Sequence, residues 1–458
     1  EALVQAEGLV LSDDSRLLDE VTGLVEWPIT LMGNIDDEFM VLPPKVLIAA
    51  MRGHQKYFST LNVDGKLASK FIFISNIEVA DGSNAIVIGN ERVLRARLSD
   101  AKFFWDQDRK DNLESYLPKL AEVIFNAKLG SMLEKTERMA TLANFLSAYI
   151  PDAKTENVER AARLSKADLV TGMVGELPEL QGLMGRYYAL ETGEDIDVAD
   201  AIADHYSPVG PCDSCPSKPV SVAVALADKI DTLVKFWTIE EKPTGSKDPF
   251  ALRRAALGVI RLIIENNLRL SLLEVFAVAG GEDVASELLS FFADRMKVHL
   301  REKGVRQDLI DAVFALGEDD IVRMLARVNA LDEFLNCDDG ANLLAAYKRA
   351  ANILKIEEKK DGKNYMDIPD PALLKEYDEK VFFKKLMAVG PRITAYIAEE
   401  KYKKVMMELA KVRSEMDSFF DNVTVNDQQP DLRENRLNLL SYFRRALDEV
   451  ADFSNIGG

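Results

Sequence analysis

The chain has 458 residues, of which 47% are hydrophobic and 8% aromatic, a composition typical of a globular protein with about three domains. Its formal net charge of −19 argues against indiscriminate binding to nucleic acid or to acidic membranes, although local basic patches can still hold one specific RNA. No apolar run reaches the ~20 residues that span a membrane, and three cysteines cannot form a disulfide framework, so we expect a cytoplasmic protein.

The first part of the chain, residues 1–115, is expected to be an α/β portion. Short apolar runs of strand length occur at 39–42 and 71–74. An Asp-Gly turn separates the second run from strand-like residues 57–61, which predicts a hairpin. A helical pattern with interspersed arginines follows at 90–106.

The middle of the chain, residues 116–268, is expected to be a helical domain. Apolar residues recur at three- and four-residue steps over 129–149, 158–174 and 249–266, which predicts amphipathic helices. A loop rich in proline and serine interrupts them at 207–219.

The last part is also expected to be helical. Residues 269–335 carry no chemical motif and read as a helical linker, and residues 336–458 read as a C-terminal helical domain. An amphipathic helix is predicted at 345–354, and a polar, charged stretch at 357–363 is expected to interrupt the helices. The fold class is therefore mainly α and multidomain.

A basic turn at 243–254, Pro-Thr-Gly-Ser-Lys-Asp-Pro-Phe-Ala-Leu-Arg-Arg, combines a Gly-Ser turn with a helix start. Asp248 can cap the helix and Pro249 suits its first turn. Exposed backbone N–H groups beside basic side chains could hold a phosphate or a carboxylate. A capped core helix with a solvated basic edge explains the same residues. The candidate anion contacts are Lys247, Arg253 and Arg254.

Asp168, His205 and Asp228 lie in helical context and resemble the metal ligands of HD-type phosphohydrolases. In such enzymes a His, a His-Asp pair and a late Asp bind a cation that activates water. Here Ala167 stands before Asp168 and offers no lone pair, so we predict a degenerate HD-like site with no metal. Cys212 and Cys215 have metal-ligand spacing but lack further nearby ligands.

The C-terminal helices carry basic and amide side chains near aromatic residues. Such groups read the exposed edges and faces of unpaired RNA bases, although a plain helical bundle with solvated basic residues has the same composition. The candidate contacts are Lys348, Arg349, Arg433, Asn435 and Arg436.

Taken in order, several motifs resemble the β subunit of bacterial heterotetrameric glycyl-tRNA synthetase. The basic turn is long enough to make the resemblance specific. A C-terminal segment also resembles the anticodon-binding domain shared with arginyl-tRNA synthetase. The matching segments are residues 52–58, 166–182, 227–233, 243–258, 348–354 and 419–440.

The resemblance implies a role in making glycyl-tRNA from glycine, ATP and tRNA(Gly), in an α2β2 complex. The α subunit of this family activates glycine, so ATP and Mg²⁺ are expected there, with no catalytic residue, cofactor or metal on this chain. The β subunit is expected to bind tRNA, not DNA, with residues 336–458 at the anticodon. The chain looks like a β subunit without its N-terminal portion and should be inactive alone. The alternatives are a metal-dependent HD-type phosphohydrolase and a scaffold for the α subunit.

Overall fold

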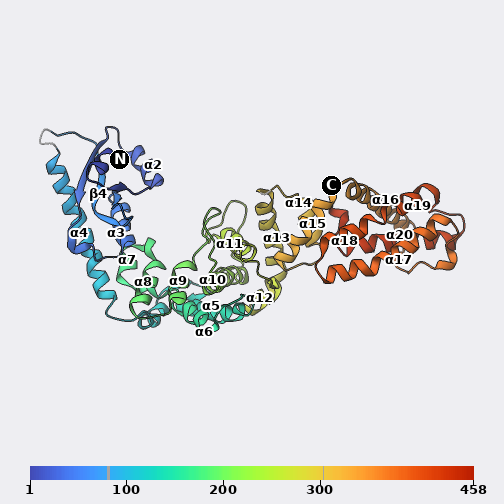
Figure 1. Cartoon of the computed structure of the whole chain (residues 1–458). Helices are drawn as coiled ribbons and strands as arrows, with labels where there is room; N and C mark the ends of the chain where they lie inside the picture. Colours follow the sequence, from blue (N-terminus) through green and yellow to red (C-terminus); the bar gives the residue numbers. More distant parts are fainter. Residues whose placement is uncertain (80–82, 303, 458) are drawn as a thin grey trace. The chain divides into compact units, whose positions relative to one another are not determined.

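The computed structural model describes residues 1–79, 83–302 and 304–457. The chain forms two compact units, Glu1–Ser207 with Pro216–Asp231, and Pro208–Cys215 with Thr232–Gly458. Helices dominate both units, which confirms a mainly α fold with a small N-terminal sheet (Figure 1). Within the described ranges, no helix has the length and apolar character needed to cross a membrane.

The first unit contains the strands and the first ten helices, the last of which it shares with the second unit. The strands are β1 (Val10–Leu11), β2 (Ile29–Asn34), β3 (Phe58–Leu61), β4 (Leu67–Ser75), β5 (Ile124–Asn126) and β6 (Gly130–Ser131). The helices are α1 (Ala2–Ala6), α2 (Ser15–Leu24), α3 (Pro44–Arg52), α4 (Asn84–Asp108), α5 (Met132–Ser147), α6 (Thr155–Leu164), α7 (Gly172–Glu176), α8 (Leu183–Glu191), α9 (Ile196–Asp204) and α10 (Pro219–Thr238). Short 3₁₀ helices are η1 (Asp37–Phe39), η2 (Leu113–Ala121), η3 (Ala167–Val170) and η4 (Pro178–Leu180).

Four strands form an antiparallel sheet in the order β1-β3-β4-β2. The predicted hairpin is confirmed, because β3 pairs with β4 across a turn that the Asn62 N–H closes on the Lys66 carbonyl at 2.8 Å. The strand predicted at 39–42 is wrong. Phe39 ends η1, and the prolines at 43 and 44 cannot donate hydrogen bonds to a strand ladder.

The helix predicted at 90–106 is confirmed and extended in α4, which packs against β2 and α7 (Figure 1). The helix predicted at 158–174 is instead broken into α6, η3 and α7. Thr171 is extended, with φ −83° and ψ 154°, and its hydroxyl caps the start of α7 by accepting from the Val174 N–H. A side chain suited to an N-cap thus starts a new helix inside an otherwise helical pattern.

The second unit consists of helices and connecting loops, with no strand among its described residues. It includes the end of α10, from Thr232 onward. The domain boundaries predicted at residues 115, 268 and 335 stay predictions. Its other helices are α11 (Leu252–Glu265), α12 (Leu272–Val278), α13 (Ala285–Glu302), α14 (Gln307–Phe314), α15 (Ile321–Leu335), α16 (Asp338–Asp361), α17 (Tyr377–Ala398), α18 (Tyr402–Ala410), α19 (Arg413–Asn422) and α20 (Pro430–Asp448). Its 3₁₀ helices are η5 (Glu282–Val284), η6 (Pro371–Leu373) and η7 (Phe453–Asn455).

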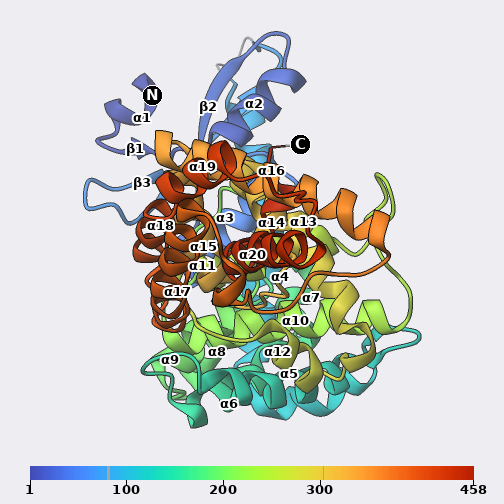
Figure 2. The ribbon, with the colours of Figure 1, turned by 90° about the vertical axis from the view of Figure 1, so that its right-hand side faces the viewer.

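The helices α16, α17, α19 and α20 pack on one another, and α18 packs against α17 and α15 (Figure 2). The break predicted at 357–363 is wrong up to Asp361, because α16 continues to that residue. Glu357 is buried inside this bundle and forms an ion pair with Arg433 of α20. A charged stretch therefore stays helical where a partner from another helix neutralises it.

Candidate functional site

The HD-like cluster lies in the first unit, where α5, η3, α9 and α10 bring charged side chains into the core. The Lys166 ammonium lies 2.7 Å from Nε2 of His205 and 3.3 Å from Oδ2 of Asp228. The Lys135 ammonium, from α5, lies 3.0 Å from Oδ1 of Asp228. The Lys166 side chain and the His205 ring are both buried. Two ammonium groups therefore surround the carboxylate of Asp228.

The hydrogen bonds around His205 assign its tautomer. Its Nδ1–H donates to the Ile202 carbonyl at 2.8 Å, which leaves Nε2 to accept from Lys166. Burial, with the Lys166 charge, holds the pKa of His205 well below its usual value, so the ring is neutral. Burial acts to raise the pKa of Asp228, but the Lys135 and Lys166 charges outweigh it and hold that pKa well below its usual value.

Asp168, which its sequence context suggests as a metal ligand, instead binds backbone N–H groups. Its Oδ2 accepts from the backbone N–H groups of Gly182 and Gly185, at 2.5 and 3.0 Å. A Cβ on Gly185 would lie 2.6 Å from the Ile202 side chain, so only glycine brings this N–H to the carboxylate. Burial raises the pKa of Asp168 to about 6. The carboxylate thus fixes the start of α8.

Across the described part of the chain, no three His, Cys, Asp or Glu side chains are grouped so that they could hold a metal ion. Sequence reasoning named Asp168, His205 and Asp228 but missed the lysines between them. The signal was available, since Lys166 immediately precedes the alanine that breaks the HD pair. An ammonium ion cannot lower the pKa of a bound water as a metal does, so this geometry disfavours the phosphohydrolase reading.

The basic turn lies in the second unit, ahead of α11. Thr244 and Lys247 exchange two backbone hydrogen bonds, of 3.0 and 2.8 Å, with Gly245 in the left-handed region at φ 51°. The N-cap residue of α11 is Ala251, and the carboxylate of Asp248, three residues earlier, accepts from the N–H groups of Leu252 and Arg253 at 2.8 and 3.0 Å. The helix starts at Leu252, so Pro249 lies in the preceding turn and not in the first helical turn.

These contacts reduce the number of predicted groups that can still bind an anion. Asp248 takes the first N–H groups of the helix, and the Arg253 guanidinium donates to the Gly245 carbonyl at 2.7 Å. Lys247 and Arg254 are exposed, and neither is paired with an acidic side chain among the residues that the structure places. Of the three predicted contacts, these two remain available to a phosphate.

The loop that precedes α10 is held against α11. Arg261 donates to the carbonyls of Gly210, Pro211 and Asp213, at 3.0, 3.1 and 2.7 Å. Within this loop Cys212 is exposed and Cys215 is half-buried, and neither forms a disulfide.

The predicted RNA contacts near the C-terminus have partners within the chain. Arg433 pairs with Glu357 and Asp361, and Asn435 exchanges hydrogen bonds of 2.7 and 3.1 Å with the backbone of Asp370. Asn435 is buried, so its expected contact with a base would require it to leave these partners.

Arg436 is also buried and pairs with Glu379 and Asp427. Lys348 donates to the Gly457 carbonyl at 3.0 Å, and Arg349 is exposed with its guanidinium 4.2 Å from the Phe420 ring. Of the five predicted contacts, Arg349 is the one whose side chain the structure leaves mostly in solvent.

Comparison with known proteins gives two family matches. Residues 1–315 match the family described as glycyl-tRNA synthetase beta subunit, and residues 343–456 match the DALR anticodon binding domain. Proteins named glycine–tRNA ligase beta subunit are similar over the whole chain. One from Rhodospirillum centenum is 55% identical over 100% of this chain and 66% of its own length. One from Phenylobacterium zucineum is 51% identical, over 100% and 68%. The chain thus spans about two thirds of the length of these relatives.

Proposed function

Because the chain belongs to the family of glycyl-tRNA synthetase β subunits, we propose that it is the tRNA-binding partner in the ligation of glycine to tRNA(Gly). The observation that carries this proposal is the anticodon-binding domain over residues 343–456, joined to a β-subunit match over residues 1–315. Lys247 and Arg254, exposed and without acidic partners in the described residues, supply positive charge for a phosphate backbone on an otherwise acidic chain.

The proposal divides the work between two kinds of chain. Activation of glycine takes place on an α subunit in an α2β2 complex, which also binds ATP and Mg²⁺, and this chain supplies no catalytic residue. The lysine-filled HD-like cluster supports this division, because it offers no set of metal ligands for hydrolytic chemistry. A cytoplasmic location, expected from three cysteines that form no disulfide framework, belongs to the same proposal.

The test is an aminoacylation assay with purified components. We expect no glycyl-tRNA from this chain alone or from the α subunit alone, and glycyl-tRNA when the α subunit is combined with full-length β subunit. Binding of tRNA(Gly) to this chain, measured separately by fluorescence anisotropy, should be salt-sensitive. Charging by this chain alone would overturn the division of roles, and absence of tRNA binding would overturn the RNA-binding role.

A further inference from the structure

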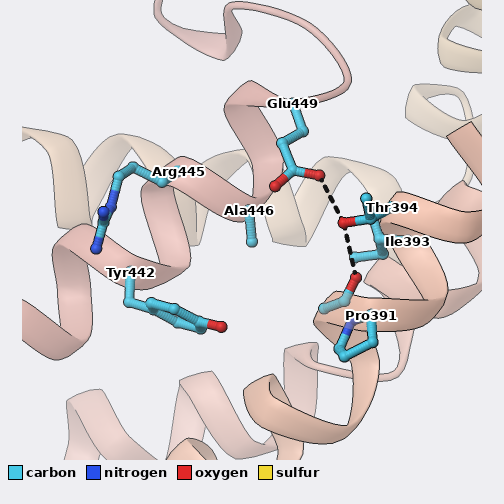
Figure 3. A pocket seen from close by; sticks show the side chains of 8 residues that line it. Pro391, Ile393, Thr394, Tyr442, Arg445, Ala446 and Glu449 are labelled. Atoms are coloured by element: carbon cyan, nitrogen blue, oxygen red, sulfur yellow. Dashed lines mark hydrogen bonds between the residues drawn. The ribbon is translucent and has the colours of Figure 1, made fainter. Parts of the chain in front are cut away.

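A pocket of about 360 Å³ opens between α17 and α20, in the part of the chain that matches the anticodon-binding domain. Figure 3 shows the Tyr442 ring and Pro391 on one side, with Arg445 and Glu449 along α20. The residues that line the pocket include Gly390, Pro391, Thr394, Tyr442, Arg445 and Glu449.

A Gly-Pro pair within α17 lines the pocket. Pro391 has no N–H, so the helix lacks one internal hydrogen bond at this turn. Gly390 has no side chain, and a Cβ there would face the Tyr442 hydroxyl at 3.7 Å. The Thr394 hydroxyl lies 3.3 Å from the Gly390 carbonyl and 3.1 Å from Oε2 of Glu449 (Figure 3). This hydroxyl therefore fixes the Glu449 carboxylate at one end of the pocket.

Arg445 is the feature that points to a ligand. Its Nε and Nη2 are buried, and neither has a hydrogen-bond partner among the residues described. Glu449 follows one helical turn later but is engaged by Thr394. A guanidinium carries five N–H donors, and leaving buried donors unpaired is unfavourable. A ligand that supplies acceptors would relieve this cost.

We propose that this pocket binds a single unpaired nucleotide of the tRNA. The Arg445 guanidinium donates to a phosphate or to a base oxygen, and the Tyr442 ring provides a stacking surface. A carboxylate such as that of Glu449 accepts hydrogen bonds, so it selects a base edge with donors, such as the cytosine amino group. The volume lies at the lower end of small-molecule sites, which suits one base and not a duplex.

This inference rests on the proposed tRNA-binding role, and the experiment separates the two. Binding of RNA stem-loops to the full chain is measured by fluorescence anisotropy. One stem-loop carries the tRNA(Gly) anticodon loop, and each of the others has one loop base removed. We expect Arg445→Ala to weaken binding of the intact loop about tenfold. In that variant, removal of the base that occupies the pocket should have no further effect.

The matched control is Arg444→Ala, which removes the same charge from the neighbouring position of α20, where Arg444 lies 3.5 Å from Glu358. This variant should keep the wild-type dependence on each loop base.

Glu449→Gln should reduce the preference for cytosine over uracil at one loop position, because an amide also donates. Thermal unfolding checks each fold. Arg445→Ala should unfold close to the wild-type temperature, since its buried Nε and Nη2 make no hydrogen bond in the described chain and its guanidinium faces only the Tyr442 ring, 5.7 Å from the ring centroid.

Three outcomes are distinguishable. If the wild-type chain binds no RNA, the proposed function fails. If it binds RNA but Arg445→Ala and Arg444→Ala have equal affinity and equal dependence on every loop base, the pocket inference alone is overturned. If an acidic peptide competes with a fluorescent peptide probe at this pocket and RNA does not, the occupant is a protein and the inference is also overturned.

Discussion

Lys166 places its ammonium 2.7 Å from Nε2 of His205 and 3.3 Å from the carboxylate of Asp228, between two groups that would otherwise suit a cation. Burial lowers the pKa of this lysine to about 8, against the raising effect of Asp228, so the ammonium form predominates at neutral pH. A neutral imidazole and an ionised carboxylate are thus satisfied by one side chain. At the scale of one residue, the Lys166 ammonium makes this group of side chains a structural ion cluster.

Asp168 gives a prediction about pH. Burial raises its pKa from the ordinary 3.8 to about 6, so its stabilising contribution is complete below the unfolded pKa and is lost as pH rises through about 6. The free energy of unfolding of the wild type, relative to Asp168→Asn, should fall by about 1 kcal/mol between about pH 5 and about pH 7. Urea unfolding at both pH values measures this change.

The control for this prediction is Asp152→Asn, because Asp152 is exposed. Its difference from the wild type should be the same at both pH values. A pH-independent difference for Asp168→Asn would show that the carboxyl titrates alike in the folded and unfolded chains.

At the scale of elements, arginines of α20 join helices that lie far apart in sequence. Arg436 reaches Glu379 of α17 and also donates to the Thr424 carbonyl at 2.9 Å, and both side chains of the ion pair are buried. Arg436→Met should therefore destabilise the chain by about 3–5 kcal/mol, because it leaves Glu379 buried without its partner. Urea unfolding measures the loss.

Two further variants make the Arg436 prediction specific. The double variant Arg436→Met/Glu379→Met should recover most of the lost stability, since no buried charge remains. Arg163→Met, which removes an exposed arginine whose partner Glu159 is also exposed, should change stability little. If Arg436→Met instead left stability unchanged and weakened tRNA binding, the arginine would be an RNA contact, as the sequence suggested.

At the scale of the whole molecule, a net charge of −19 makes any exposed cation without an acidic partner important for RNA binding. Lys247 and Arg254 are two such residues in the described chain, so the double variant Lys247→Ala/Arg254→Ala should weaken tRNA binding. The slope of log affinity against log salt should become shallower by about 2 if both contact phosphates. Anisotropy titrations at several salt concentrations measure this slope.

The comparison for the salt slope is Lys242→Ala. Lys242 already pairs with Glu240 and Glu287, so its removal should leave the slope unchanged. Equal slopes for the double variant and the wild type would remove the basic turn from the RNA interface.

Much of the fold could be predicted from local sequence, because hydrophobic periodicity and turn residues act over short distances. The hairpin and the helices within 90–106 and 129–149 are examples. The secondary-structure predictions were wrong where a neighbouring residue or a tertiary contact opposed the local hydrophobic pattern. Prolines 43 and 44 prevented a strand, Thr171 started a new helix, and an ion pair from Arg433 kept a charged stretch in α16 helical.

The candidate sites were less predictable, because the partner of a charged side chain is set by tertiary packing. Arg433 meets Glu357 and Arg436 meets Glu379, acids more than 50 positions away, and nothing local indicates these pairs. The pocket beside Arg445 was missed for the same reason, since its two walls come from separate helices. Family resemblance indicated which part of the chain meets RNA but not which side chains are free to do so.

Because the Lys166 ammonium is part of the translated chain, the charge that it brings to the HD-like cluster does not depend on a supply of metal ions. The ammonium form predominates at neutral pH whatever the manganese, iron or zinc content of the cell. A chelator cannot strip it, and a wrongly chosen metal cannot replace it. The contacts of Lys166 with His205 and of Lys135 with Asp228 therefore hold the surrounding helices together without a response to metal availability.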